Sequence, residues 1–499
     1  MASIKGISAN LGFKVLAYLA AFFFQIYYAR VLGPEVLGNF GLAMSVFALI
    51  NVLAVMGLDT SLTRSLPQFR TQADFTEKVA LYLGYALRFS TMLCLGFLLT
   101  AVMLRHDISR IISPGSDIGI YIVLFAPISL LTVWGLLFGA AMRAWERFTA
   151  YSFANDFLPR FALGSTFAGA YEITGRGQFS YLLGSALAPV LQLSAMLRFL
   201  GVDTLRRLVR PPKDLGSQAR ATFLRFGLKT ALYSFLVSGM AQTARLALGY
   251  FGENEGVGVY MVVESLAAVL VFVQSSFGTV FTPQIARLYH TGQRDAMLVL
   301  FRRLSRWAVV ATVPFFMVVL VDSREIIGLY GDEFAGGQSA LVVLMSAQFA
   351  VVSLGLNGNV LYMTGRENVM VAGQVANLVA AVAASFVLIP RLGLVGAALA
   401  IGGSAVVVNM GFMVAVGRLY NVTQFSVDSW RTLMAGVSLA LVLRLLVVPL
   451  QFGNIMFNVI GKLMLSYLVF AVLVLLVDRR QEDVEVLTAL WSRLRRSFR

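Results

Sequence analysis

Charged residues interrupt several long apolar runs of this sequence. In the stretch SGMAQTARLALGYF, which begins at Ser238, Arg245 is the only charged residue. Other charges inside or at the end of apolar runs are Lys14, Asp59, Arg88, Asp156, Arg160, Glu264, Arg444 and Lys462. A charge at the centre of a membrane-spanning helix costs about 2.5–3.5 kcal/mol on insertion scales, so it usually faces a wet cavity, a partner or the interface. These residues are therefore the candidates for chemistry if the runs cross a membrane.

The cations of this set favour an anionic ligand, because an arginine fork donates paired hydrogen bonds that suit phosphate. Four different apolar runs contain one cation each: Lys14, Arg88, Arg160 and Arg245. Arg88 lies about nine residues, or ~13 Å, into its run, which is beyond easy snorkelling. Lys14 and Arg245 lie nearer the end of a run, where the interface is the alternative. Arg160 follows Asp156 by four residues, so these two can instead neutralise each other on one helix face.

The carboxylates of the set are candidates for ion coupling. A carboxylate held away from water can carry a proton or hold a cation, and Glu264, Asp59 and Asp156 are the acids available. Asp59, in GLDTSLTR, is better explained as a helix cap or a partner of Arg64, which leaves Glu264 as the leading candidate. Arg444 and Lys462 are expected near the outer interface.

The elements that carry these charges are predicted to be transmembrane helices. Of the 499 residues 58% are hydrophobic and 13% charged, and the mean hydropathy is +0.79, which is far more apolar than a soluble domain. Pro127, Pro159, Pro189 and Pro314 fall inside apolar runs, where each is expected to kink its helix. Runs of about 20 apolar residues, long enough to cross a bilayer, recur about fourteen times: 9–29, 38–59, 80–104, 118–142, 148–171, 177–199, 226–251, 257–282, 307–330, 338–363, 368–389, 394–417, 431–450 and 456–477. The fold class is therefore an all-α polytopic membrane protein.

Composition also limits the chemistry and sets the orientation. Cys94 is the single cysteine, and the two histidines, His106 and His290, lie far apart, which argues against a disulfide framework and a metal site. The net charge of +15 would suggest a nucleic-acid partner in a soluble protein. Here the Lys and Arg residues concentrate in alternate connections between the runs, as the positive-inside bias requires. We therefore expect cytoplasmic N- and C-termini and no nucleic acid.

The two halves of the sequence resemble each other. ARVLGPEVLGNFGLAMS from Ala29 is matched by ARLALGYFGENEGVGVYMVVES from Ala244, and SLPQFRTQAD from Ser65 by FTPQIARLYHTGQRD from Phe281. These matches predict two parallel six-helix bundles with the substrate site between them, which is a transporter architecture. The expected segments are a first bundle (1–200), a basic cytoplasmic linker (201–225), a second bundle (226–418), two additional transmembrane helices (419–478) and a basic amphipathic tail (479–499).

The order of the motifs also carries a resemblance to a known family. They are ARVLGPEVLGNFGLA, MGLDTSLTRSLPQF, FTPQIARLYHTGQ, LYGDEF, LYMTGRENVM and LIPRLGLVGAALAIGGSAV. The chain is similar to the bacterial Wzx-type flippases of polysaccharides and lipid-linked oligosaccharides, within the multidrug/oligosaccharidyl-lipid/polysaccharide flippase superfamily. The resemblance implies a V-shaped pair of bundles, a central cavity, alternating access and the bacterial inner membrane. The family often has an acid near the position of Arg245, so this arginine is a departure that favours an anionic substrate.

The resemblance further implies the substrate, a polyprenyl-pyrophosphate-linked oligosaccharide that moves from the cytoplasmic to the periplasmic leaflet for O-antigen (lipopolysaccharide) or exopolysaccharide synthesis. We predict that the four cations line a cavity for the pyrophosphate. Polar groups expected to contact the sugars are Gln25, Tyr27, Gln242 and Tyr260. A proton or sodium gradient is the only cofactor-like requirement expected. The other expected partners are membrane lipids, a polysaccharide polymerase and a chain-length regulator.

Three alternative functions stay open. An ion-coupled multidrug exporter or a lipid II flippase would share the fold. The exporter is disfavoured because cations outnumber acids in the apolar runs and because about fourteen spans, rather than twelve, are expected. A membrane polymerase or ligase would need catalytic groups on a sizeable outer loop, and the outer connections near 105–117 and 331–337 are short. We therefore expect that the protein is not an enzyme.

Overall fold

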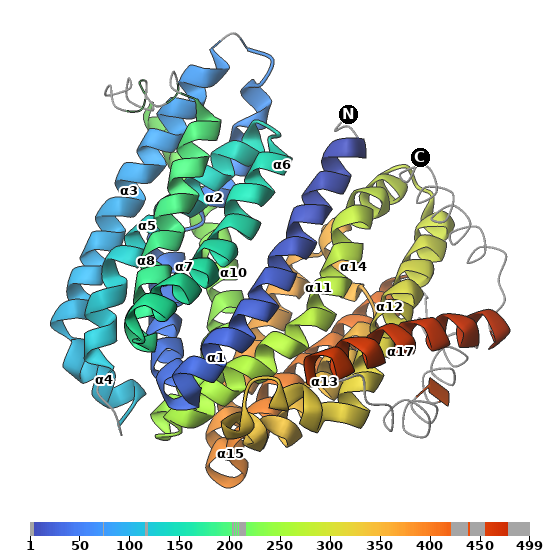
Figure 1. Ribbon diagram of the computed structural model, residues 1–499. Coiled ribbons are helices and arrows are strands. Elements are labelled where there is room, and N and C mark those ends of the chain that lie inside the picture. Colours follow the sequence, from blue (N-terminus) through green and yellow to red (C-terminus); the bar gives the residue numbers. More distant parts are fainter. Residues whose placement is uncertain are drawn as a thin grey trace, which may run out of the picture. The chain divides into compact units, whose positions relative to one another are not determined.

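The structure is a computed structural model that describes residues 4–72, 74–114, 118–201, 216–420 and 455–477, together with residues 204, 206, 208, 438 and 439. In this part of the chain all regular elements are helices (Figure 1). Nine helices among the described residues are long and apolar enough to cross a membrane. The expected all-helical class is thus confirmed.

The chain divides into two compact units. Unit 1 comprises Met1–Met261 and Ala381–Ala397, and unit 2 comprises Val262–Ala380 and Ala398–Arg499. Two long helices, α11 (Asn254–His290) and α15 (Glu367–Tyr420), contribute residues to both units.

Unit 1 begins with a long helix that contains two of the predicted spans. α1 (Ile4–Val55) is interrupted at Gly33, whose backbone angles are φ 72° and ψ 169°. Glycine adopts this left-handed φ without steric cost, so the chain turns there between the spans expected at 9–29 and 38–59. A second break at Met56 and Gly57, with φ of 49° and 67°, leads into α2 (Leu58–Ser65).

The other helices of unit 1 form a bundle around α1 and α5. They are η1 (Pro67–Phe69), α3 (Phe75–Met103), α4 (Arg105–Ile112), α5 (Gly119–Ala144), α6 (Phe148–Tyr151), η2 (Ser152–Phe157), α7 (Leu158–Thr174), α8 (Gly177–Leu200) and α10 (Ser217–Tyr250). α1 packs on α3, α5, η2, α7 and α10, and α7 packs along α8. The η2 segment is a π-helical turn directly before Pro159, whereas α5 and α8 continue through Pro127 and Pro189 as helices.

The two turns that the sequence repeat relates pack against each other within unit 1. A Cβ atom added to Gly38 would lie 1.9 Å from the carbonyl oxygen of Asn254, and one added to Gly258 would lie 1.9 Å from the carbonyl oxygen of Pro34. Gly38 follows Pro34 by four residues, as Gly258 follows Asn254. The two contacts are therefore reciprocal, as they are across a two-fold interface, and only glycine permits the approach on either side.

Unit 2 is built on a bent helix. α12 (Arg294–Gly328) packs against α13 (Gln338–Ser353), against η3 (Asp332–Gly337) and against α17 (Ile455–Val477). The non-helical residue of α12 is Asp322, with φ −127° and ψ 28°, eight residues after Pro314. α12 is thus irregular at a position that the proline alone does not predict.

Three predicted spans after residue 337 are interrupted or merged. The span expected at 338–363 consists of α13 and of α14 (Asn357–Met363), separated by a break at Gly355 with φ 83°. The spans expected at 368–389 and 394–417 form one helix, α15, with a break at Gly393. The predicted span at 431–450, the tail at 479–499 and Arg444 lie outside the described residues, apart from residues 438 and 439.

Candidate functional site

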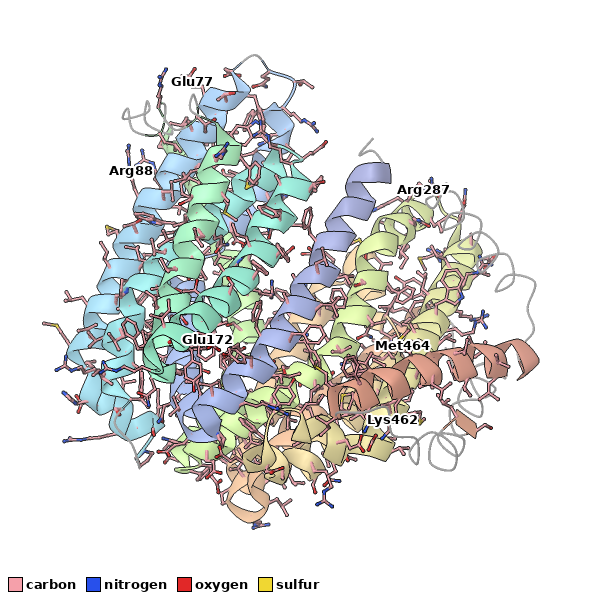
Figure 2. All side chains as sticks on the ribbon, in the orientation of Figure 1. Glu77, Arg88, Glu172, Arg287, Lys462 and Met464 are labelled. Atoms are coloured by element: carbon pink, nitrogen blue, oxygen red, sulfur yellow. The ribbon has the colours of Figure 1, made fainter. Side chains whose placement is uncertain are left out.

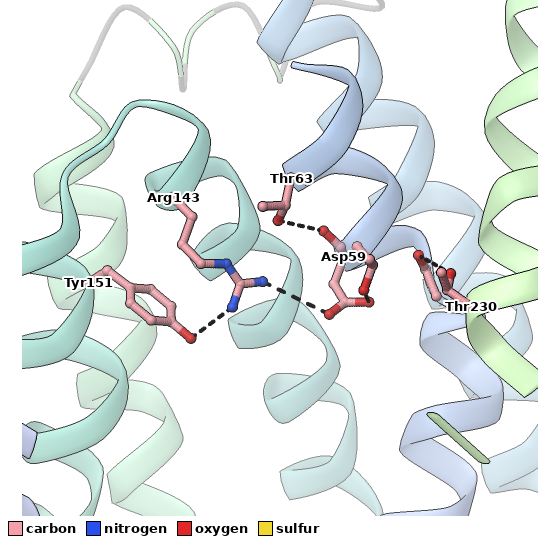
Figure 3. Close-up of polar contacts among 7 residues, drawn as sticks. Asp59, Thr63, Arg143, Tyr151 and Thr230 are labelled. Atoms are coloured by element: carbon pink, nitrogen blue, oxygen red, sulfur yellow. Dashed lines mark hydrogen bonds and ion pairs between the residues drawn. The ribbon is translucent and has the colours of Figure 1, made fainter. Parts of the chain in front are cut away.

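A group of polar side chains surrounds Arg143 in unit 1 (Figure 3). Arg143, near the end of α5, lies with its Nη2 atom 3.9 Å from Oδ2 of Asp59 on α2. Its Nη1 atom donates a hydrogen bond of 3.0 Å to the hydroxyl of Tyr151 on α6, and the guanidinium lies 5.0 Å from the centroid of the Tyr151 ring. We call these three residues the Arg143 cluster. Its two charged side chains, Asp59 and Arg143, are 27% and 29% exposed.

The break between α1 and α2 positions Asp59 for this contact. Asp59 lies in the first turn of α2, where a carboxylate is favoured by the helix dipole, as the sequence suggested. Its partner is Arg143 rather than the expected Arg64, which instead lies 4.1 Å over the ring of Phe226. Thr230 of α10 donates a hydrogen bond to the carbonyl of Gly57 at the break, so α10 helps to hold it (Figure 3).

The π-helical turn η2 presents Asp156. Oδ1 of Asp156 accepts a 3.0 Å hydrogen bond from Asn155, whose own Oδ1 accepts one of 3.2 Å from Gln192. Oδ2 of Asp156 is buried without a hydrogen-bond partner. Arg160 donates to the backbone carbonyl of Asp156 rather than to its carboxylate, so the predicted pair forms through the main chain. One carboxylate oxygen is thus buried and unpaired, so it could accept a proton or contact a cation.

α1 brings Lys14 and Gln25 to the same side of unit 1. Phe13, next to Lys14, contacts the ring of Phe153 in η2 with centroids 5.5 Å apart. The exposed Arg160 lies 5.7 Å over the ring of Tyr18, one helical turn after Lys14. Lys14 and Gln25 are both half-buried. The structure thus brings three of the predicted residues, Lys14, Asp156 and Arg160, onto packed segments.

Arg245 lies on α10 beside an aromatic cluster. Its side chain is half-buried, and Nη1 lies 3.4 Å from Oε1 of Gln242, a weak hydrogen bond one turn earlier on the helix. α10 packs on α1, and α1 also contributes Phe40 and Tyr28 to an aromatic cluster with Tyr181, at centroid distances of 4.7 and 5.4 Å. Arg245 is therefore a half-buried cation on a helix that packs against α1.

The remaining predicted residues lie elsewhere. Arg88 is exposed near the middle of α3 and points outward from that helix (Figure 2), so unit 1 does not group it with the other cations. Glu264 is half-buried on α11 and belongs to unit 2. Tyr27 donates a 3.4 Å hydrogen bond to Glu172, and Tyr260 is buried in the core of unit 1.

The side chain of Lys462, which is expected near the outer interface, is buried rather than exposed. Only 2% of it is accessible, and Nζ donates hydrogen bonds of 2.6 Å to Oδ2 of Asp322 and 2.8 Å to Oε2 of Glu325; Figure 2 labels its position on α17. We call these three residues the Lys462 triad. Desolvation explains the difference, because a buried ammonium needs paired acceptors, and α12 supplies two. The signal in the sequence is the pair of acids three residues apart in the run that ends near 330.

Among the described residues no group of His, Cys, Asp or Glu is arranged to hold a metal ion.

A family model described as "polysaccharide biosynthesis protein" matches residues 3–289, more than half of the chain. No curated protein matches the sequence significantly.

Solved structures have the same fold. The lipid II flippase MurJ in an inward closed conformation superposes with a TM-score of 0.68 over 95% of this chain and 99% of its own, at 12% identity. An inward-facing multidrug resistance MATE family transporter of the MOP superfamily gives 0.69 over 83% and 98%, at 17% identity. A MOP superfamily transporter from Pyrococcus furiosus, described as having a binding pocket of reverse polarity, gives 0.56 over 84% and 95%, at 16% identity.

At these identities the likeness establishes the fold, and the family match covers the half of the chain that contains Arg245 and the Arg143 cluster. The chain is a multi-pass membrane protein with the fold of these transporters, and it belongs to the polysaccharide biosynthesis protein family.

Proposed function

We propose that the protein is a flippase that moves a polyprenyl-pyrophosphate-linked oligosaccharide from the cytoplasmic to the periplasmic leaflet of the bacterial inner membrane by alternating access. Membership of the polysaccharide biosynthesis family supports the class of substrate. The match to the lipid II flippase, which extends over 95% of this chain, supports transport of a lipid-linked sugar.

The observation that carries the proposal is the environment of Arg245. A half-buried guanidinium with a hydrogen bond to Gln242, on a helix that packs on α1, combines a charged group for pyrophosphate with a neutral polar group for sugars. Lys14 and Arg160, on the packed segments α1 and α7, add positive charge to unit 1. Gln25 is the neutral polar residue that we assign to sugar contacts. Arg88 contributes least, since its side chain points outward.

The proposed topology has fourteen transmembrane helices with both termini in the cytoplasm. Two parallel six-helix bundles, residues 1–200 and 226–418, are joined by the basic linker and followed by two further helices and the tail. The reciprocal contacts of Gly38 and Gly258 support the repeat that underlies this scheme.

Ion coupling in this proposal uses a carboxylate and a proton or sodium gradient. Asp156 is supported by its buried Oδ2 atom without a partner. Asp59 forms an ion pair with Arg143, which makes its carboxylate less able to bind a proton or a sodium ion. Glu264 remains a candidate in unit 2. Loss of gradient dependence in Asp156→Asn or in Glu264→Gln identifies the coupling residue, and unchanged dependence in both removes these two assignments.

The product would feed a polymerase and a chain-length regulator in O-antigen or exopolysaccharide assembly. Deletion of the gene tests this directly: surface polymer should disappear while lipid-linked repeat units accumulate on the cytoplasmic leaflet. Accumulation of lipid II instead would favour the second candidate, a lipid II flippase, which the match to MurJ supports. Unchanged polymer and no lipid-linked intermediate would contradict both.

A further inference from the structure

Helix α17 contacts α12 through one buried stripe. Side chains spaced four residues apart face inward, with exposures of 8% for Asn458, 2% for Lys462, 0% for Ser466 and 2% for Phe470. The opposite side of α17 is apolar and exposed at Phe457, Met464, Leu468 and Val472. The helix therefore has one docking face with polar groups and one face suited to lipid.

The hydrogen bonds between α17 and α12 fall at two places in α12, around Pro314 and around Asp322. Ser466 donates a 3.2 Å hydrogen bond to the carbonyl of Pro314, and the neighbouring Tyr467 donates one of 3.0 Å to the carbonyl of Ala311. Pro314 has no N–H, so the carbonyl of Val310, four residues earlier, lacks its usual helical donor. The two hydrogen bonds from α17 are made to other carbonyls of the same helical turn. Lys462 meets the second irregularity, at Asp322.

The Lys462 triad pairs a buried ammonium with two carboxylates of different burial. The Asp322 side chain is 11% exposed and that of Glu325 35%, against 2% for the lysine. Removing one partner of such a buried group leaves an uncompensated charge, whereas replacing the whole set by neutral groups is tolerated far better. The triad thus holds α17 in one register.

The bent part of α12 also carries its other neighbour, α13. Phe316 stacks on Phe349 with centroids 4.2 Å apart, and Gln338 donates a 3.1 Å hydrogen bond to Ser323, next to Asp322. The stretch from Ala311 to Glu325 is therefore held on one side by α17 and on another by α13.

We propose that α17 stabilises the bent helix α12 and stays packed against it throughout the transport cycle. Lys462 is the positioning residue that fixes how α17 is aligned along α12. In this proposal α17 is an integral part of unit 2. It is so even though the MATE family transporters match only 83–84% of the chain.

The first test fixes the docking covalently. A Cβ atom at Gly328 would lie 3.3 Å from Cδ1 of Ile455, so Gly328→Cys with Ile455→Cys, in a Cys94→Ser background, can be joined by a short bifunctional thiol reagent. We expect high cross-linking yield and transport at the rate of the unlinked protein. Arrest of transport by the cross-link, with each single cysteine variant still active, would overturn the proposal.

The second test does not depend on what the protein transports. Lys462→Met should lower the midpoint of thermal unfolding in detergent by about 10 °C and reduce the yield of the 328–455 cross-link. The triple variant Lys462→Met, Asp322→Asn and Glu325→Gln removes all three charges, and it should recover most of both losses. If Lys462→Met unfolds at the wild-type temperature, or keeps the full cross-linking yield, Lys462 does not position α17.

Discussion

Among the described residues, the Arg143 cluster of unit 1 and the Lys462 triad of unit 2 are built in opposite ways. The Arg143 cluster holds its ion pair at 3.9 Å with more than a quarter of each side chain exposed. The Lys462 triad holds its contacts at 2.6 and 2.8 Å around a lysine that is 2% exposed. Water screens the first pair, so its attraction is weak and its members can separate at little cost. In the second the pair of Lys462 and Asp322 is 2% and 11% exposed, so separating these two would leave bare charges in an apolar medium, whereas Glu325 is 35% exposed.

The two clusters illustrate two roles that charged side chains can have within a membrane, ligand binding and helix packing. A loosely held cation can exchange its protein partner for a ligand, whereas a fully paired cation serves packing. Arg245 is closer to the first class in exposure, since its side chain is half-buried whereas that of Lys462 is 2% exposed. Lys462 belongs to the second, although the sequence presents both simply as single cations in apolar runs.

The largest expected contrast is in stability. Lys462→Met should cost about 3–5 kcal/mol of unfolding free energy because it strands two carboxylates, whereas Arg143→Met should cost about 0–1 kcal/mol because its ion pair is partly exposed. Thermal or chemical unfolding of the two purified variants measures both. Equal losses would show that the clusters are energetically alike and would break the comparison.

A smaller contrast concerns how much a half-buried and an exposed arginine contribute to transport. Arg245→Ala should slow polymer export by about 10- to 100-fold, which corresponds to the loss of charge-assisted hydrogen bonds worth about 1.5–3 kcal/mol. Arg88→Ala, the matched control on an exposed side chain, should leave export within about twofold. Export is followed by surface polymer at equal protein levels; an equal defect in both variants would contradict the assignment of Arg245.

The smallest contrast concerns single hydroxyls. Tyr467→Phe should cost about 0.5–1.5 kcal/mol, since its hydrogen bond to the carbonyl of Ala311 supports the turn that Pro314 interrupts. Tyr151→Phe should be close to neutral, because Arg143 retains contact with the ring. Unfolding midpoints of the two variants are the measurement, and a larger loss for Tyr151→Phe would reverse the ranking.

Much of the fold could be predicted from apolar periodicity. The spans at 118–142, 177–199 and 456–477 coincide closely with α5, α8 and α17, because a run of about 20 apolar residues has few other ways to satisfy its backbone. The sequence predicts a helix break at a glycine only where a turn motif surrounds it, as at Gly33. It does not predict the break at Gly355 inside the span 338–363, because apolar side chains continue through that glycine.

The charged clusters were harder to predict, because their partners lie far apart in sequence. Lys462 and Asp322 are separated by 140 residues, and a single sequence contains no signal that these two helices pack together. Arg143 is not among the candidates from the sequence, because its contact with Asp59 depends on the break at Gly57. Arg88 was misleading for the opposite reason: depth along a helix does not say which face a residue occupies.

The most direct test is transport in vesicles that contain only this protein. Reconstituted protein should move a labelled polyprenyl-pyrophosphate-linked oligosaccharide across the bilayer, detected by its accessibility to a membrane-impermeant reagent, and Arg245→Ala should reduce the rate by about 10- to 100-fold. Movement no faster than in protein-free vesicles, or an Arg245→Ala variant as fast as the wild type, would contradict the account.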